Sequence, residues 1–277
     1  LLVYFVGVLV FGERWLERGE SFAVFFRVVS WLAPIGVRRP APHSDAGGPC
    51  QVELTAPTLR LLRQDAPDAS VVALVLLVLA SVSFDGLSRT FAWLGFLGEN
   101  PLAYPGRTAL MARNTLGLLG LFAVAALAYA AAARLSARLA RAGAPGGSSP
   151  GVLALSLVPI AFGYHFAHYL PVFMVDIQQA LRAASDPFAL GWNVLGTRDL
   201  YVVTSFLSDP SRVYAIWHTQ VAVIVAAHVG GVTIAHALAL RLAGRAAATA
   251  LSQLPMLALM SGYTMFGLWL LSAPTAG

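Results

Sequence analysis

The sequence predicts an all-α fold, a polytopic transmembrane helix bundle with at least five spans and a remnant helix at its amino-terminal end. Composition is the first observation: 58% of the 277 residues are hydrophobic and only 11% are charged. The mean hydropathy is +0.72. The second observation is that the apolar residues form runs of roughly 20 residues, the length that a helix needs to cross a bilayer. Both are typical of a single integral membrane domain.

The amino-terminal part does not contain a complete span. Its first apolar run, LLVYFVGVLVFG, is too short to cross a membrane, so we expect the end of a helix in a fragment whose upstream helices are missing. Residues 19–33 mix aromatic side chains with Arg and Glu, which predicts an amphipathic helix at the membrane interface. Residues 36–68 are rich in Pro, Gly and Asp, and we predict a loop without a packed domain.

Five spans follow, bounded by charged residues, aromatic belts and turn signals. The first ends near Asp85, and the second carries Arg113 and Asn114 in its first turns. A long connector with Asp-Pro turns separates the third from the fourth. The predicted spans cover residues 70–84, 109–133, 151–182, 212–240 and 249–272.

The charges predict an orientation. All 18 basic residues are Arg, and 12 of them fall before the first span or just after residues 134 and 241. Because cytoplasmic loops carry the excess of basic residues, we expect the loops after residues 134 and 241 to be cytoplasmic. The net charge of +5 therefore reports orientation and predicts no nucleic-acid partner. The single cysteine, Cys50, excludes a disulfide within the chain.

The third span carries ionisable residues inside an apolar segment. His165, His168 and Asp176 fall on one stripe of a helix that advances about 100° per residue. Ionisable side chains are costly in hydrocarbon, so such a stripe predicts a functional site. Pro159 and Pro171 are expected to kink this helix.

The fourth span adds His218, His228 and His236. Aligning the helix midpoints puts His228 and His165 at one depth. We therefore predict a metal site with His165, His168 and His228 as ligands for zinc, copper or iron, with Asp176 and His218 relaying protons. Two alternatives stay open: bis-histidine ligation of haem b, or histidines that only hydrogen-bond neighbouring helices.

A second polar group lies at the outer ends of the first two spans: Asp85, Arg89, Arg113 and Asn114. It predicts either an ion pair between Asp85 and Arg113 or an anion clamp, because arginine binds phosphate oxygens bidentately. In the second case Arg113 would stabilise charge during catalysis.

Several stretches together resemble one protein family: GERWLERGESFAVFFRVVSWLAPIG, SFDGLSRT, VPIAFGYHFAHY, SDPFALGWNVLGT, HTQVAVIVAAHVGGVTIAH and GYTMFGLWLLS. They resemble bacterial multi-spanning membrane proteins commonly labelled fenitrothion hydrolase. The resemblance covers nearly the whole chain and implies an organophosphorus ester hydrolase in the bacterial inner (plasma) membrane. It also implies a longer protein. Among the matching positions are His168, His228 and His236.

The sequence thus favours a metal-dependent membrane hydrolase of lipophilic phosphotriester-like substrates, in which the metal activates a bound water. One alternative is a haem- or copper-binding redox subunit, which paired histidines within the membrane favour. The other is a transporter or assembly subunit without catalysis, which helices interrupted by Pro and Gly favour. Expected partners are the lipid bilayer, a small lipophilic substrate and further subunits of a membrane complex.

Overall fold

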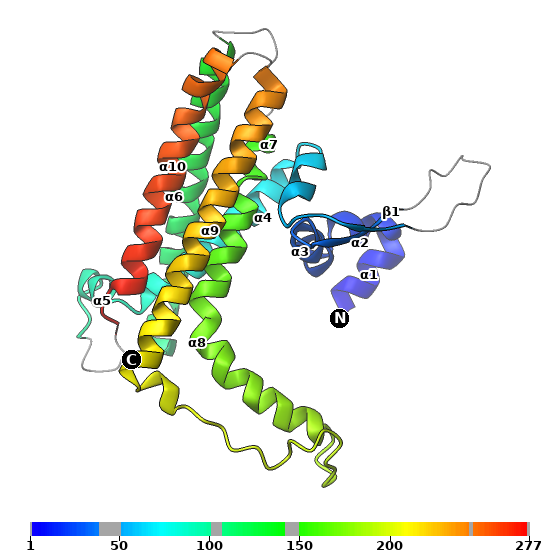
Figure 1. The fold of residues 1–277 in the computed structure, drawn as a ribbon, viewed down its shortest axis with the longest axis vertical. Coiled ribbons are helices and arrows are strands. Elements are labelled where there is room, and N and C mark those ends of the chain that lie inside the picture. The colour runs from blue at the N-terminus through cyan, green and yellow to red at the C-terminus, as the bar shows by residue number, and fades with distance from the viewer. Residues whose placement is uncertain (1, 39–50, 101–106, 142–149, 244–245, 276–277) are drawn as a thin grey trace, which may run out of the picture.

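The computed structural model describes residues 2–38, 51–100, 107–141, 150–243 and 246–275 and is almost entirely helical (Figure 1). Five of its helices are long and apolar enough to cross a membrane, which confirms the predicted all-α bundle and a multi-pass membrane protein. These five are α4 (Ala69–Ser88), α6 (Arg107–Arg141), α8 (Leu157–Ser185), α9 (Pro210–Ala243) and α10 (Ala246–Ser272). Each falls on one predicted span. Helices α4 and α6 extend beyond their spans by a turn or more at the carboxyl end, whereas α8 begins at Leu157, later than predicted.

The bundle is held by close helix contacts. Helix α8 packs mainly on α9, while α10 packs on α6, α9 and α4. Gly163 permits the closest approach, because a Cβ added there would lie 2.3 Å from the Cβ of Ala227 in α9. Gly231 is also tight, since its added Cβ would lie 2.7 Å from the carbonyl oxygen of Ser156. Small residues at helix interfaces are how membrane helices gain packing contacts.

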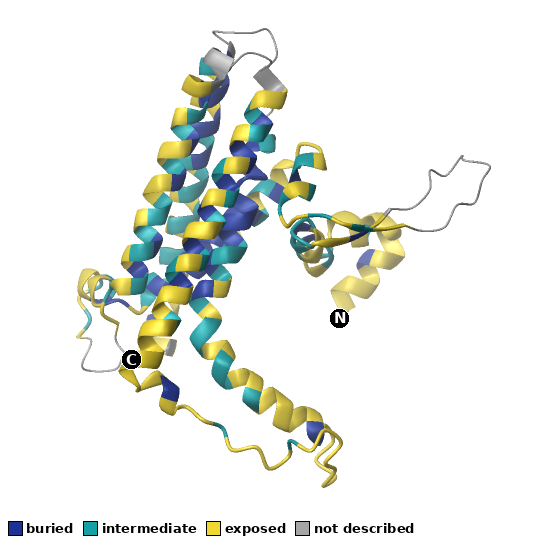
Figure 2. Ribbon diagram, viewed as in Figure 1, coloured by how far each residue is buried: buried dark blue, intermediate teal, exposed yellow. Residues whose placement is uncertain are grey.

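Helix α8 has two halves in different surroundings. Its first half is buried, as at Val158, Tyr164 and Ala167. Pro171 lies inside the helix, and beyond it α8 bends away from the bundle toward an irregular connector (Figure 1). That second half and the connector are mostly exposed (Figure 2). A proline removes a backbone hydrogen bond, which accounts for a bend at this point.

The amino-terminal segment lies beside the bundle (Figure 1). It comprises α1 (Leu2–Phe11), α2 (Glu13–Arg18) and α3 (Ser21–Ser30), and α3 is the helix predicted over residues 19–33. Glu20 caps α3 by accepting the N–H groups of Phe22 and Ala23. Val24 and Val28 of α3 join the core formed with α4 and α8.

The region predicted as a loop, residues 36–68, contains regular structure. Strands β1 (Ile35–Arg38) and β2 (Gln51–Leu54) pair antiparallel, and a 3-10 helix, η1 (Leu59–Arg63), follows. Exposed Val37, Val52 and Leu54 show that the hairpin has no core of its own. The loop prediction therefore missed the hairpin and η1, because the strands are only four residues long and lie in a stretch rich in Pro and Gly.

Short elements complete the fold. They are α5 (Phe91–Phe96), α7 (Pro150–Ala154) and the 3-10 helix η3 (Ser205–Leu207). Residues 39–50, which include Cys50, and residues 142–149 fall outside the described parts of the chain.

Candidate functional site

The main polar contact inside the bundle joins α4 to α8. The imidazole of His168 donates its Nε2–H to Oδ2 of Asp85 over 2.8 Å. The His168 side chain is 20% exposed and that of Asp85 is 31% exposed. Arg89, one turn beyond Asp85 on α4, lies 3.4 Å from the other carboxylate oxygen and is half exposed. The three side chains form a partly buried ion-pair cluster at the end of α4.

Packing holds this pair in place. A Cβ added to Gly86 would lie 3.5 Å from Cε1 of His168, so the imidazole packs closely against α4 at this glycine. The ring of Tyr169 contacts His168 edge-on, with centroids 4.8 Å apart. Gln220 of α9 donates to the carbonyl oxygen of Ala167 over 2.7 Å, which fixes the α8 backbone next to His168.

A row of buried aromatic and hydroxyl groups continues inward from the pair. The ring of Tyr164 lies 6.3 Å from that of His168 and 6.0 Å from that of Tyr263 in α10. The hydroxyl of Tyr263 hydrogen-bonds the Ser83 hydroxyl and donates to the carbonyl oxygen of Leu79 at 3.2 Å. We call Ser83, Tyr164, Tyr263 and His228 the polar row.

His228 closes the polar row. Its ring stacks on Tyr263 with centroids 6.4 Å apart, and its Nδ1–H donates to the carbonyl oxygen of Ile224 over 2.8 Å. The residue is 8% exposed, and its Nε2 is buried without a hydrogen-bond partner. His165 makes the same backbone contact, from Nδ1 to the carbonyl oxygen of Ala161 at 2.9 Å. In both histidines the other ring nitrogen, Nε2, keeps its lone pair.

The structure does not assemble the predicted three-histidine site. No group of three or more His, Cys, Asp or Glu side chains among the described residues is placed to share a metal ion. The contacts between α8 and α9, at Gly163 and Ala167, put His168 roughly 10 Å along the bundle axis from the level of His228. The midpoints of the two helices are not level, because α8 continues past the bundle.

The residues predicted to assist catalysis lie elsewhere. Asp176 is exposed on the outer half of α8. His218 is exposed on α9, where it donates to the carbonyl oxygen of Tyr214 at 2.9 Å. Arg113 pairs with Glu99 at 2.5 Å and not with Asp85, so the predicted Asp85–Arg113 ion pair is wrong. His236, likewise exposed, contacts Gln253.

Asn114, the remaining member of the predicted outer group, has a structural contact. It accepts the indole N–H of Trp93 over 2.9 Å, which ties α6 to the short helix α5. With Arg113 bound to Glu99 and Asn114 bound to Trp93, the predicted anion clamp is not formed by these two side chains. Arg89 is the arginine that lies beside Asp85.

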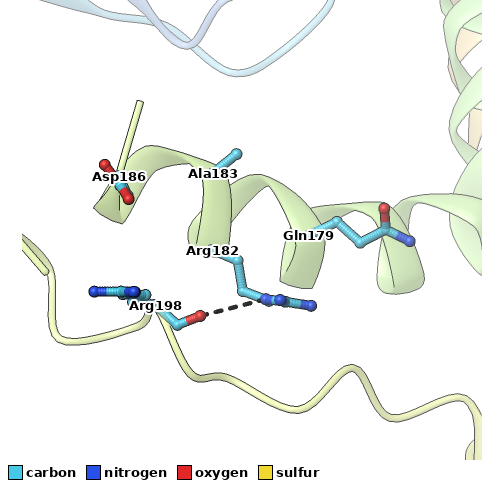
Figure 3. Close-up of a pocket in the computed structure, with 5 residues that line it drawn as sticks. All are labelled: Gln179, Arg182, Ala183, Asp186 and Arg198. Atoms are coloured by element: carbon cyan, nitrogen blue, oxygen red, sulfur yellow. Dashed lines mark hydrogen bonds between the residues drawn. The ribbon is translucent and has the colours of Figure 1, made fainter. Parts of the chain in front are cut away.

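An open cleft lies at the far end of α8, away from the bundle (Figure 3). It measures about 360 Å³ and is lined by Gln179, Arg182, Ala183, Asp186 and Arg198. Arg182 donates to the carbonyl oxygen of Arg198 at 3.4 Å, and Arg198 donates to that of Gly191 at 2.7 Å. Arg182 therefore ties the connector to α8, whereas Arg198 joins two parts of the connector, and both contacts are structural.

Sequence reasoning identified His168 but grouped it with the carboxylate of Asp176, on the same helix, instead of that of Asp85. Asp85 was placed in a separate outer group, and its contact with His168 spans 83 residues. Spacing along one helix cannot detect a pair between two spans. Tyr263 and Ser83 were missed because a hydroxyl in an apolar span carries no signal of its own. Comparisons of the chain with models of protein families, with curated proteins and with solved structures found no match.

Proposed function

We propose that this multi-pass membrane protein is a hydrolase of lipophilic, phosphotriester-like esters, with His168 as the general base and Asp85 as the residue that orients it. The 2.8 Å bond between His168 Nε2 and Asp85 Oδ2 carries the proposal. The resemblance of the sequence to membrane proteins labelled as organophosphorus ester hydrolases points to the same reaction class.

A carboxylate bound to one imidazole nitrogen prepares the other nitrogen as a base. With the proton on Nε2 directed at Asp85, the lone pair of His168 lies on Nδ1. The carboxylate also stabilises the imidazolium that forms when Nδ1 takes up a proton. Both side chains are partly exposed, which leaves room beside the pair for a water molecule.

The depth of the pair favours hydrolysis over transport. Asp85 lies three residues before the end of α4 at Ser88, which is about 4.5 Å along the helix. Water and a substrate dissolved in the acyl chains meet at this boundary. Transporters, in contrast, bind their substrates near the bilayer midplane.

The proposed step balances with water as the only co-reactant. His168 Nδ1 takes one proton from a water molecule while the water oxygen bonds to phosphorus. The bond from phosphorus to the leaving oxygen breaks, and the leaving group departs with the electron pair. The imidazolium then returns its proton to the leaving group or to solvent. The half-exposed guanidinium of Arg89 supplies a positive charge for the phosphoryl oxygens.

The metal-dependent form of this hypothesis would need a ligand set that the described residues do not assemble. Zinc, copper or iron, and haem b in the redox alternative, therefore stay predictions that no observation tests. The general-base form needs only His168, Asp85 and Arg89.

Hydrolysis of a chromogenic aryl phosphotriester by the purified protein in lipid vesicles tests the proposal. His168→Ala should lower the rate about 10²–10⁴-fold, the usual contribution of a general base. Asp85→Asn should lower it as well and should change its dependence on pH. His236→Ala, a histidine on the same bundle outside the pair, is the matched control and should leave the rate unchanged.

Two results would contradict the proposal that His168 acts as a general base without a metal. One is a His168→Ala variant as active as wild type. The other is activity that disappears with a chelator and returns with a metal ion, which would support the metal-dependent form instead.

A proton-coupled transporter is the second candidate, and the polar row favours it. Its hydroxyls and imidazole run from the outer end of the bundle toward the middle, and His228 Nε2 has no partner. Such a row offers a path for protons. Proton uptake by vesicles that is lost in Tyr263→Phe, without hydrolysis in wild type, would favour transport.

A further inference from the structure

A cavity separate from the Asp85–His168 pair lies between the amino-terminal helices and the start of α4. It measures about 350 Å³, and its charged lining residues are Arg18 at the end of α2, Arg27 on α3 and Asp68 at the cap of α4. The two arginines outnumber the one carboxylate, so the lining carries a net positive charge. Arg18 and Arg27 are exposed side chains, and Arg27 uses one guanidinium nitrogen to bind the carbonyl oxygen of Glu17 at 2.9 Å.

The cavity changes from polar to apolar along α4. Asp68 and Ser70 lie at the start of the helix, while Val71 and Leu74 lie up to six residues further in, about 9 Å deeper along its axis. On the other wall α3 contributes one polar residue, Ser21, and one apolar residue, Val24. This succession matches a phospholipid, whose headgroup lies at the interface and whose acyl chains extend into the hydrocarbon.

Helix α3 has the distribution of buried and exposed residues that is typical of an interfacial helix. Val24 and Val28 pack into the core, whereas Phe22 and Phe26 are 63% and 62% exposed. Exposed aromatic side chains beside arginines, next to the beginning of a span, are typical of a helix that lies in the interface. The arginine count also assigns this end of the bundle to the cytoplasmic side, where anionic lipid attracts basic residues.

We infer that this cavity binds an anionic phospholipid, with the phosphate held by Arg18 and Arg27 and an acyl chain lying along Val24, Val71 and Leu74. The Ser21 and Ser70 hydroxyls provide further donors for the phosphate oxygens. The lipid would fasten the amino-terminal helices to α4 at the point where the two meet. This inference does not depend on the hydrolase proposal.

Native mass spectrometry of the purified chain, titrated with phosphatidylglycerol or with phosphatidylcholine, tests the site. Replacing both arginines, Arg18→Gln with Arg27→Gln, should weaken phosphatidylglycerol binding about 25-fold, roughly fivefold for each arginine near the surface. Phosphatidylcholine binding should stay the same. The double variant Arg18→Lys with Arg27→Lys keeps both charges and should retain most of the preference.

The matched control changes two exposed arginines at the same end of the bundle, Arg134→Gln with Arg138→Gln, and removes the same charge. An equal loss in this control would show general attraction to a basic surface and would overturn the site. Unchanged binding in the Arg18/Arg27 variant would do the same. Displacement of the lipid by excess inorganic phosphate would identify a free-phosphate site and would equally refute a lipid.

Discussion

Buried polar side chains set the character of this bundle at the scale of single residues. Asp85, His168, Tyr263 and Ser83 each have a partner on another helix, as a polar group in hydrocarbon requires. His228 differs, because its Nδ1 is satisfied by its own helix while Nε2 is buried and unpartnered. An unsatisfied acceptor costs free energy, so either His228 is retained for a function or its Nε2 binds a group in the native protein.

Replacing His228 with Leu separates these cases. If Nε2 has no partner in the folded protein, His228→Leu removes an unsatisfied acceptor and should change the free energy of unfolding in detergent by less than about 1 kcal/mol. The loss of activity or proton uptake in the same variant would then be functional. A destabilisation of several kcal/mol would mean that Nε2 binds a group in the native protein, contrary to the contacts described above.

Asp186 gives a pH prediction outside the membrane. Desolvation raises the pKa of its carboxyl, but hydrogen bonds from the backbone N–H groups of Gly191, Leu190 and Trp192 lower this pKa by more. The charge of Arg198 acts in the same direction, so the pKa lies below its ordinary value of 3.8. A group with a depressed pKa stabilises the folded turn above that ordinary value, and the stabilisation is lost as the pH falls through the folded pKa.

Hydrogen exchange can measure this. Protection of the Leu190 and Gly191 amides should fall as the pH drops below about 4, and Asp186→Asn should lower it at neutral pH as well. Asp199→Asn, a nearby exposed carboxylate, is the control and should leave the protection unchanged. Protection independent of pH in the wild type would contradict the role of Asp186.

At the scale of elements, α8 combines a tightly packed half with an exposed half. In the packed half, the absence of a side chain at Gly163 lets α9 approach closely. The bend follows at Pro171. His168 lies between these two positions. Its place opposite Asp85 is in the half of α8 that also packs against α4.

Gly163→Ala should push α8 and α9 apart, because the new Cβ would lie 2.3 Å from that of Ala227. We expect a loss of about 1–3 kcal/mol in the free energy of unfolding, the usual cost of overpacking. Gly120→Ala on α6 is the matched control, since an added Cβ there meets nothing within 4 Å. The control should be neutral or slightly stabilising, because Ala favours helix more than Gly. Equal stability of both variants would refute the tight contact.

At the scale of the whole molecule, two basic regions lie at the end of the bundle where α4 begins. Arg241 at the end of α9 donates to the carbonyl oxygen of Leu62 in η1. Arg134 of α6 lines the same cavity as Pro67 and Ala69 at the start of α4. This arrangement agrees with the arginine count that predicts a cytoplasmic side.

Cysteine labelling tests the orientation. In a Cys50→Ser background, Ser211→Cys at the start of α9 should react with an impermeant reagent outside intact cells. Gln51→Cys on β2 should react only after permeabilisation. External labelling of Gln51→Cys would reverse the orientation and would move the Asp85–His168 pair to the cytoplasmic end. Ser148, in the loop after α6, lies outside the described residues.

The sequence by itself determined the fold class and the positions of the five spans. Both follow from local properties: an apolar run of sufficient length must form a helix, because hydrocarbon offers no other partner for its backbone groups. The sequence also identified His168 as an ionisable residue in a costly place.

The tertiary structure alone decided which polar groups meet. The packing of α8 on α4 puts His168 opposite Asp85, and the register of α8 against α9 at Gly163 separates His168 from His228. It likewise assigned Arg113 to Glu99. Periodicity describes one helix at a time, whereas the depth and rotation of one helix against another are set by side-chain packing between distant segments.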